Sequence, residues 1–117
     1  MLEPATRLGA PPLGSWQIVL KVLSAVYLEI LREALPRRPA SIHVQKKVGR
    51  LCSRVGLKIN SADTVIGWRK DISRSRGSAQ HDLFHQFMTD WRSHMGGRSP
   101  TTQDVDAWMQ AHLRAFG

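Results

Sequence analysis

The chain has 117 residues, of which 42% are hydrophobic and 22% charged, the size and composition of one globular domain. Its single cysteine, Cys52, excludes an internal disulfide, which agrees with a reducing, cytoplasmic location. The formal net charge of +8 indicates an anionic partner and says nothing about the fold.

The positive charge is concentrated in the middle third of the chain. Residues 37–76 hold eleven Lys and Arg against two Asp, a net charge of +9, whereas the other residues hold six Lys and Arg against seven Asp and Glu. A charge that served only solubility would be spread over the whole surface. The middle third is therefore the candidate binding segment.

Residues 1–14 contain three prolines and two glycines and are predicted to be a loose arm without the pattern of a signal peptide. Residues 15–35 are the most apolar part of the chain and predict a long helix, with Ser15 as N-cap and Pro36 ending it. Lys21 and Glu29 interrupt the apolar run, so we expect a helix buried in the core rather than one that crosses a membrane.

A second helix is predicted over 41–55, where Ser41 would be the N-cap and Gly56 the left-handed residue after the C-terminus. Its apolar stripe consists of Val44, Val48, Leu51, Cys52 and Val55. Because Cys52 belongs to this stripe, we expect it to be a buried small hydrophobe.

A third, short helix is predicted over 61–75, with Asn60 or Ser61 as N-cap. Val65, Trp68 and Ile72 would face inward, and the opposite face would hold Asp63, Gly67, Lys70 and Arg74. Gly67 lowers the helix propensity by about 1 kcal/mol relative to alanine. It either permits close approach to another surface or is simply a weak point in the helix.

Two further helices are predicted over 79–95, capped by Ser78 and ended by Gly96, and over 102–116. The short connection between them predicts an antiparallel hairpin over 78–117. Since there is no strand pattern, the expected fold is a single all-α domain of five helices over 15–117. The four tryptophans fall at inward positions, and an exposed Trp91 or Trp108 would instead mark a dimer surface.

The two middle helices, VGRLCSRVGL followed by NSADTVIGWRKDI, resemble the helix-turn-helix superfamily of DNA-binding domains over residues 41–76. The run Thr64-Val65-Ile66-Gly67-Trp68-Arg69 is also similar to a TVxxWR core in small uncharacterised bacterial proteins. One departure from the motif is the connection after Gly56, which is longer than the common turn.

The resemblance implies that the 61–75 helix enters the major groove of double-stranded DNA. The residues expected to face base edges are Ser61, Thr64, Gly67 and Lys70. The residues expected to contact phosphates are Lys46, Lys47, Arg50, Arg54, Lys58, Arg69, Arg74 and Arg76. Asp63 and Asp71 argue against this face, because phosphates repel carboxylates. The implied function is that of a bacterial, phage or mobile-element regulator of transcription, acting as a homodimer on symmetric half-sites.

The alternative is a non-enzymatic module, an adaptor or phage-type inhibitor, that docks an acidic protein partner through the same basic surface. Peripheral membrane association through residues 15–35 is a third hypothesis. The chain has no nucleophile elbow, phosphate loop or usefully spaced pair of carboxylates, so we expect no catalytic residue and no cofactor. His81 and His85 lie one helical turn apart, but neither a zincin glutamate nor a cysteine pair accompanies them, and we expect no metal site.

Overall fold

The computed structural model describes residues 13–116, with side chains from residue 16 onward. Within this range it contains five α-helices and no strand: α1 (Leu13–Leu31), α2 (Arg37–Arg54), α3 (Ala62–Arg74), α4 (Ala79–Met95) and α5 (Thr102–Leu113), followed by a 3-10 helix, η1 (Arg114–Phe116). The predicted all-α fold of five helices is confirmed. The predicted arm, 1–14, lies outside the described residues except for its last two, which belong to α1.

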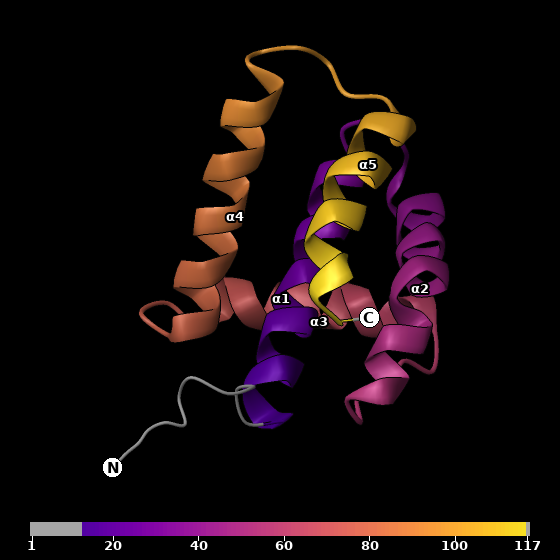
Figure 1. The fold of residues 1–117 in the computed structure, drawn as a ribbon, viewed down its shortest axis with the longest axis vertical. Helices are drawn as coiled ribbons and strands as arrows, with labels where there is room; N and C mark the ends of the chain where they lie inside the picture. The colour runs from indigo at the N-terminus through magenta and orange to yellow at the C-terminus, as the bar shows by residue number, and fades with distance from the viewer. Residues whose placement is uncertain (1–12, 117) are drawn as a thin grey trace.

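Helix α1 is the centre of the molecule, and the other four helices pack around it (Figure 1). Every side chain from Val22 to Leu28 is buried, including that of Ser24, whose hydroxyl donates to the Leu20 carbonyl at 2.8 Å. A helix that is apolar on all sides belongs in a core. The prediction of a buried rather than membrane-spanning helix agrees with this position.

The predicted starts of the first two helices are wrong. Ser15 lies inside α1, which begins at Leu13, and α1 ends at Leu31 in tight turns, well before Pro36. Pro36 is instead the N-cap residue of α2. Ser41 lies inside α2, where it is buried and its hydroxyl donates to the Arg38 carbonyl at 2.9 Å. A cap residue contributes only about 1 kcal/mol, whereas proline constrains both its own backbone and that of the residue before it.

The predicted end of α2, the N-cap of α3 and the inward face of α3 agree with the structure. Gly56 has φ = 80° directly after the C-cap of α2, and Cys52 is buried. Ser61 is the N-cap residue of α3, although its side chain makes no capping bond. Val65 and Ile72 are fully buried and Trp68 packs partly buried against the core, so α3 is held by the face that the sequence predicts.

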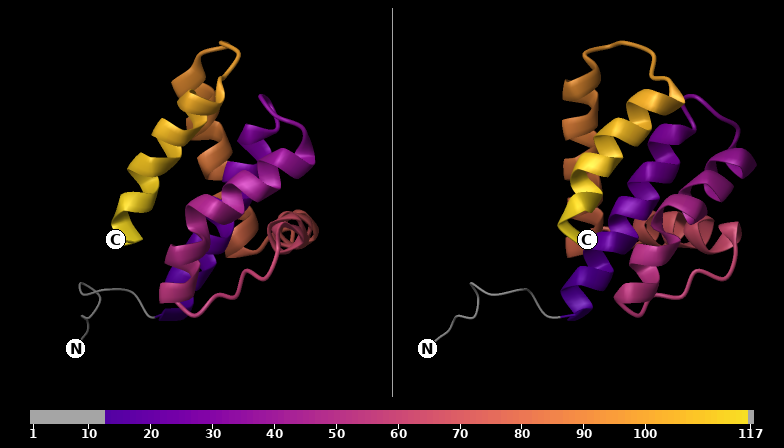
Figure 2. Two further views of the ribbon diagram at one scale, coloured as in Figure 1. Left: turned by 90° about the vertical axis from the view of Figure 1, so that its right-hand side faces the viewer. Right: turned by 45° about the vertical axis from the view of Figure 1, so that its right-hand side comes forward.

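Helices α4 and α5 run antiparallel, as predicted, and both pack on α1 (Figures 1 and 2). Large rings bridge them: the centroids of Trp91 and Trp108 are 5.3 Å apart, and those of Phe87 and His112 are 5.5 Å apart. Ser78 caps α4 by accepting from the His81 amide, and Gly96 ends it with φ = 58°. Trp91 is buried and Trp108 half-buried, so both belong to the core.

Candidate nucleic-acid interface

The outward face of α3 lies at the edge of the molecule, where Figure 2 (left) shows this helix end-on. Asp63, Lys70 and Arg74 are exposed on the side opposite the buried Val65 and Ile72. A Cβ atom added at Gly67 would meet no atom within 4 Å. A partner can therefore approach the middle of α3 closely.

The four residues predicted to face bases do not share one position on this helix. Gly67 and Lys70 lie on the outward face, and Thr64 is half-buried on one flank together with the exposed Asp71. Ser61 is exposed at the N-cap. The surface available for close contact is thus centred on Gly67 and Lys70.

A groove with a cavity of about 190 Å³ runs along the other flank of α3, against the end of α1 and the first turn of α2. It is lined by Leu28, Glu29, Arg32, Arg37, Ile66, Arg69, Lys70 and Ser73. Half of these residues are cations, contributed by three separate elements, and only one is a carboxylate. Converging cations of this kind raise the local positive potential and attract anions.

Arg69 has a different role from the predicted phosphate contact, since the groups that hold it belong to the chain itself. Its Nε donates to Oε1 of Glu29 at 2.9 Å, and its guanidinium carbon lies 4.5 Å from the ring centroid of Phe84. The ion pair balances the charge of Arg69, and the aromatic ring fixes its orientation. Arg69 therefore links α3 to α1 and α4, and its guanidinium is already engaged within the chain.

Three arginines near α3 were missed by the sequence analysis: Arg32, Arg37 and Arg38. All three are exposed, and Arg38 forms an ion pair with Asp63 across 3.3 Å, which joins α2 to α3 and offsets one of the two carboxylates of the α3 face. Arg37 and Arg38 belong to the basic segment 37–76 but precede Ser41, the predicted start of the second helix, and they were not among the predicted phosphate contacts. The signal that could have found them is Pro36, a good helix-start residue.

The cations in the second half of α2 point elsewhere. Lys46, Lys47, Arg50 and Arg54 are exposed, but α3 and its preceding loop pack on another side of α2, where Ile59 lies 3.9 Å from a Cβ placed at Gly49. Lys47 lies toward α5, where its charge acts on Asp106. Figure 2 (left) shows α5 and α3 on opposite sides of α2. These four cations and those around α3 therefore do not form a single surface, contrary to our expectation.

The three remaining predicted phosphate contacts are exposed and scattered. Lys58, in the connection between α2 and α3, lines a cavity of about 580 Å³ together with Gln45, Ser53 and Asn60. Arg74 is on the outward face of α3, and Arg76 follows it in the turn before α4. Only Arg74 adds to the surface around Gly67.

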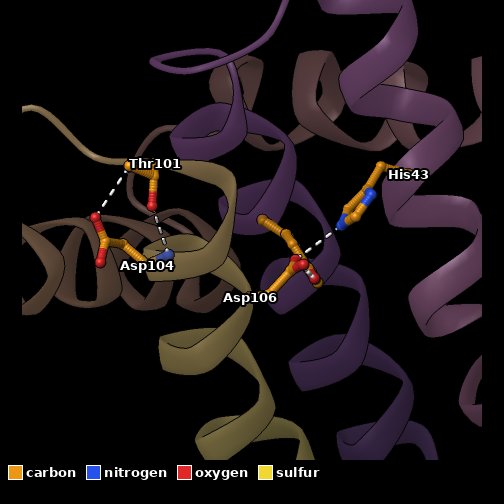
Figure 3. Close-up of polar contacts among 5 residues, drawn as sticks. His43, Thr101, Asp104 and Asp106 are labelled. Atoms are coloured by element: carbon orange, nitrogen blue, oxygen red, sulfur yellow. Dashed lines mark hydrogen bonds and ion pairs between the residues drawn. The ribbon is translucent and has the colours of Figure 1, made fainter.

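A polar cluster joins α1, α2 and α5 on the side of α2 that faces away from α3 (Figure 3). The buried Tyr27 hydroxyl donates to Asp106, and His43 Nε2 lies 2.7 Å from the same carboxylate oxygen. Partial burial opposes ionisation of Asp106, but the bonds from Tyr27 and His43 and the nearby cationic charge outweigh it and lower the pKa of this carboxyl. Burial, and then the bond to Asp106, raise the pKa of Tyr27 far above its ordinary value.

Other chemically notable groups do not build a second site. Burial raises the pKa of the Cys52 thiol to about 11, so it is protonated at neutral pH. The rings of His81 and His85 lie against each other, with centroids 4.5 Å apart and planes tilted by 56°. Within residues 13–116, no three His, Cys, Asp or Glu side chains are placed to share a metal ion. None of the five helices in this range combines the length and apolar character needed to cross a membrane.

Comparisons of the chain with protein-family models, with curated proteins and with solved structures found no match.

Proposed function

We propose that this protein is a small, non-enzymatic, cytoplasmic DNA-binding protein that presents the outward face of α3 to duplex DNA. The observation that carries the proposal is the groove in which Arg32, Arg37 and Lys70 meet beside the open surface at Gly67. A helix without a side chain at its centre can lie close to base edges in the major groove, while flanking cations hold the phosphates.

The charges around α3 are compatible with this orientation. Arg38 offsets Asp63, and Asp71 lies on the flank of α3 away from the cationic groove. We therefore assign the phosphate contacts to Arg32, Arg37 and Arg74, and the base contacts to Lys70 and the backbone near Gly67. In the common helix-turn-helix, the first helix of the pair likewise crosses the phosphate backbone beside the recognition helix.

A matched pair of double variants tests the proposal. Arg32→Gln/Arg37→Gln removes two exposed cations from the groove, and Lys46→Gln/Arg50→Gln removes two exposed cations from the outer side of α2. The dissociation constant for a short labelled duplex is measured by fluorescence anisotropy at low salt. The groove variant should bind at least about tenfold more weakly, because hydrogen bonds to charged groups each contribute about 1.5–3 kcal/mol.

The control variant should bind one duplex almost as well as the wild type, and both variants should melt at the wild-type temperature. Equal weakening by the two pairs would show that binding follows net charge and not the α3 face.

The role of a transcription regulator requires sequence preference and is part of the proposal. Selection from a random duplex library should enrich one motif, with half-sites about one helical turn apart if the protein binds as a homodimer. Lys70→Ala should relax the preference at one position of the motif, whereas Arg37→Gln should weaken binding to all sequences alike.

A second candidate is docking of a predominantly acidic protein. It is favoured by Asp63 and Asp71 on α3, because a protein, unlike DNA, can also place cations opposite these carboxylates. Patterned charge of both signs is typical of protein interfaces. Failure of the wild-type protein to bind any duplex at low salt would favour this candidate.

A further inference from the structure

We propose that the outer side of α2 binds a second DNA duplex, so that one molecule bridges two DNA segments. The surface consists of Lys46, Arg50 and Arg54, called here the α2 stripe. These residues follow one another at intervals of four along the helix, all are exposed, and α2 contains no Asp or Glu over its whole length, Arg37–Arg54. The inference rests on the proposed function, because the first duplex lies on α3.

The α2 stripe has no carboxylate partner among the described residues, in contrast to three other basic residues. Arg38 is paired with Asp63 and Arg69 with Glu29, and the charge of Lys47 acts on Asp106. Within residues 16–116, no carboxylate lies within ion-pair distance of Lys46, Arg50 or Arg54. Three unbalanced cations on one helix face form a surface for an anion that the fold itself does not supply.

The α2 stripe also lies apart from the α3 groove, on a different side of α2. Arg37, at the groove, and Arg50, in the stripe, are separated by thirteen positions, or roughly 20 Å along the helix axis. Gly49 and the loop before α3 lie on one side of α2, and Asp106 of α5 lies on the other. The α2 stripe is exposed to solvent between these two sides of α2. Helix α3 lies at a different edge of the molecule, as Figure 2 (left) shows.

The chemistry of the α2 stripe fits a duplex better than a protein. Lys46 and Arg54 are eight positions apart, roughly 12 Å along the axis, and a duplex carries roughly seven phosphate charges over that length. The only large apolar side chain exposed on α2 is Ile42, at 39%. Protein interfaces have an apolar and aromatic centre, and the stripe offers none.

A bridging assay tests the inference with the full chain. One duplex is immobilised on beads, a second duplex of the same sequence carries a fluorophore, and the label retained on the beads is measured as protein is added. Lys46→Gln/Arg50→Gln/Arg54→Gln removes the α2 stripe, and Arg32→Gln/Arg37→Gln/Lys70→Gln removes the same charge from the α3 groove. Anisotropy with one free duplex gives the single-duplex affinity of each variant.

The wild type should retain the labelled duplex on the beads. The stripe variant should keep the single-duplex affinity within about twofold and lose the retention by at least about tenfold, since only the second set of phosphate contacts is missing. Absence of retention by the wild type would overturn the inference. Retention by the stripe variant at the wild-type level would do so too, because the two duplexes would then be joined by dimerisation.

The two proposals fail in different ways. A wild type that binds single duplexes through the α3 groove without bridging them contradicts the second proposal alone. A groove variant with wild-type affinity for a single duplex contradicts the proposed function. A stripe variant that no longer binds a single duplex would show that α2 is the primary DNA surface, and would overturn both.

Discussion

Asp106 is the residue through which α5 is tied to the two helices beside it. It accepts from the fully buried Tyr27 hydroxyl and from His43, and its side chain is only 26% exposed. When one partner of a buried hydrogen bond is removed, the other keeps its desolvation cost without compensation. Loss of the Asp106 carboxylate should therefore destabilise the fold, because the buried Tyr27 hydroxyl would lose its acceptor.

We predict that Asp106→Ala lowers the free energy of unfolding by about 1–3 kcal/mol, because the Tyr27 hydroxyl is left without its acceptor. Urea denaturation followed by circular dichroism measures the loss. Asp90→Ala is the matched control, since Asp90 is exposed on α4 and forms no ion pair or side-chain hydrogen bond within residues 16–116. A loss no larger than that of the control would contradict the structural role of Asp106.

The same contacts make the contribution of Asp106 depend on pH. Its pKa in the folded protein lies below the ordinary value of 3.8, so the folded state favours the carboxylate. The resulting stability is fully present above that ordinary value and is lost as the pH falls through the lower, folded pKa. The difference in unfolding free energy between wild type and Asp106→Ala should therefore shrink below about pH 4.

Among the elements, α3 combines a well-buried apolar face with a residue of low helix propensity, Gly67, at its centre. Val65 and Ile72 hold it against the core, yet Gly67 occupies the middle of its outward face, with empty space where a Cβ would lie. Since no packing requires glycine at this position and Gly67 has an ordinary helical φ, its cost is one of helix propensity. The proposed close approach of DNA to the middle of α3 would explain why a glycine occupies this position despite its cost in helix stability.

We predict that Gly67→Ala raises the free energy of unfolding by up to about 1 kcal/mol, as expected from helix propensity alone. Gly67→Gln should leave the fold intact and weaken duplex binding, because its longer side chain stands between α3 and the base edges. Chemical denaturation and duplex titration of both variants separate the two effects. Undiminished duplex binding by Gly67→Gln would mean that Gly67 is only a weak point in the helix.

The positions of all five helices could be predicted from apolar periodicity, because the buried stripes of α2 to α5 and the all-round burial of α1 are local patterns. The starts of α1 and α2 were predicted wrongly because Ser15 and Ser41 are typical cap residues, although Pro36 is a local signal for the start of α2. The groove could not be predicted either. Arg32 and Arg37 flank Pro36 in the chain, but Arg69 and Lys70 join them only because α3 crosses the end of α1.

At the scale of the whole molecule, most of the cations in and next to residues 37–76 are divided between two faces and an internal ion pair. The α3 face keeps Arg32, Arg37, Lys70 and Arg74, the α2 stripe keeps three cations, and Arg69 is balanced by Glu29. A single duplex on α3 can therefore engage only part of the total charge. The net charge of +8 overstates the number of phosphates that one binding event neutralises.

The salt dependence of binding measures that number directly. The logarithm of the binding constant falls with the logarithm of salt concentration by about 0.9 for each phosphate neutralised. The three phosphate contacts assigned to the α3 face, Arg32, Arg37 and Arg74, thus predict a slope near −2.7, whereas the eight phosphate contacts expected from the sequence alone would give about −7. Arg32→Gln/Arg37→Gln should bring the slope to about −0.9, while Lys46→Gln/Arg50→Gln should leave it near the wild-type value. Anisotropy titrations of one short duplex at four or more salt concentrations decide between these values. A wild-type slope near −5.4, the value for six contacts, would show that the α2 stripe and the α3 face bind the same duplex, which their separation along α2 argues against.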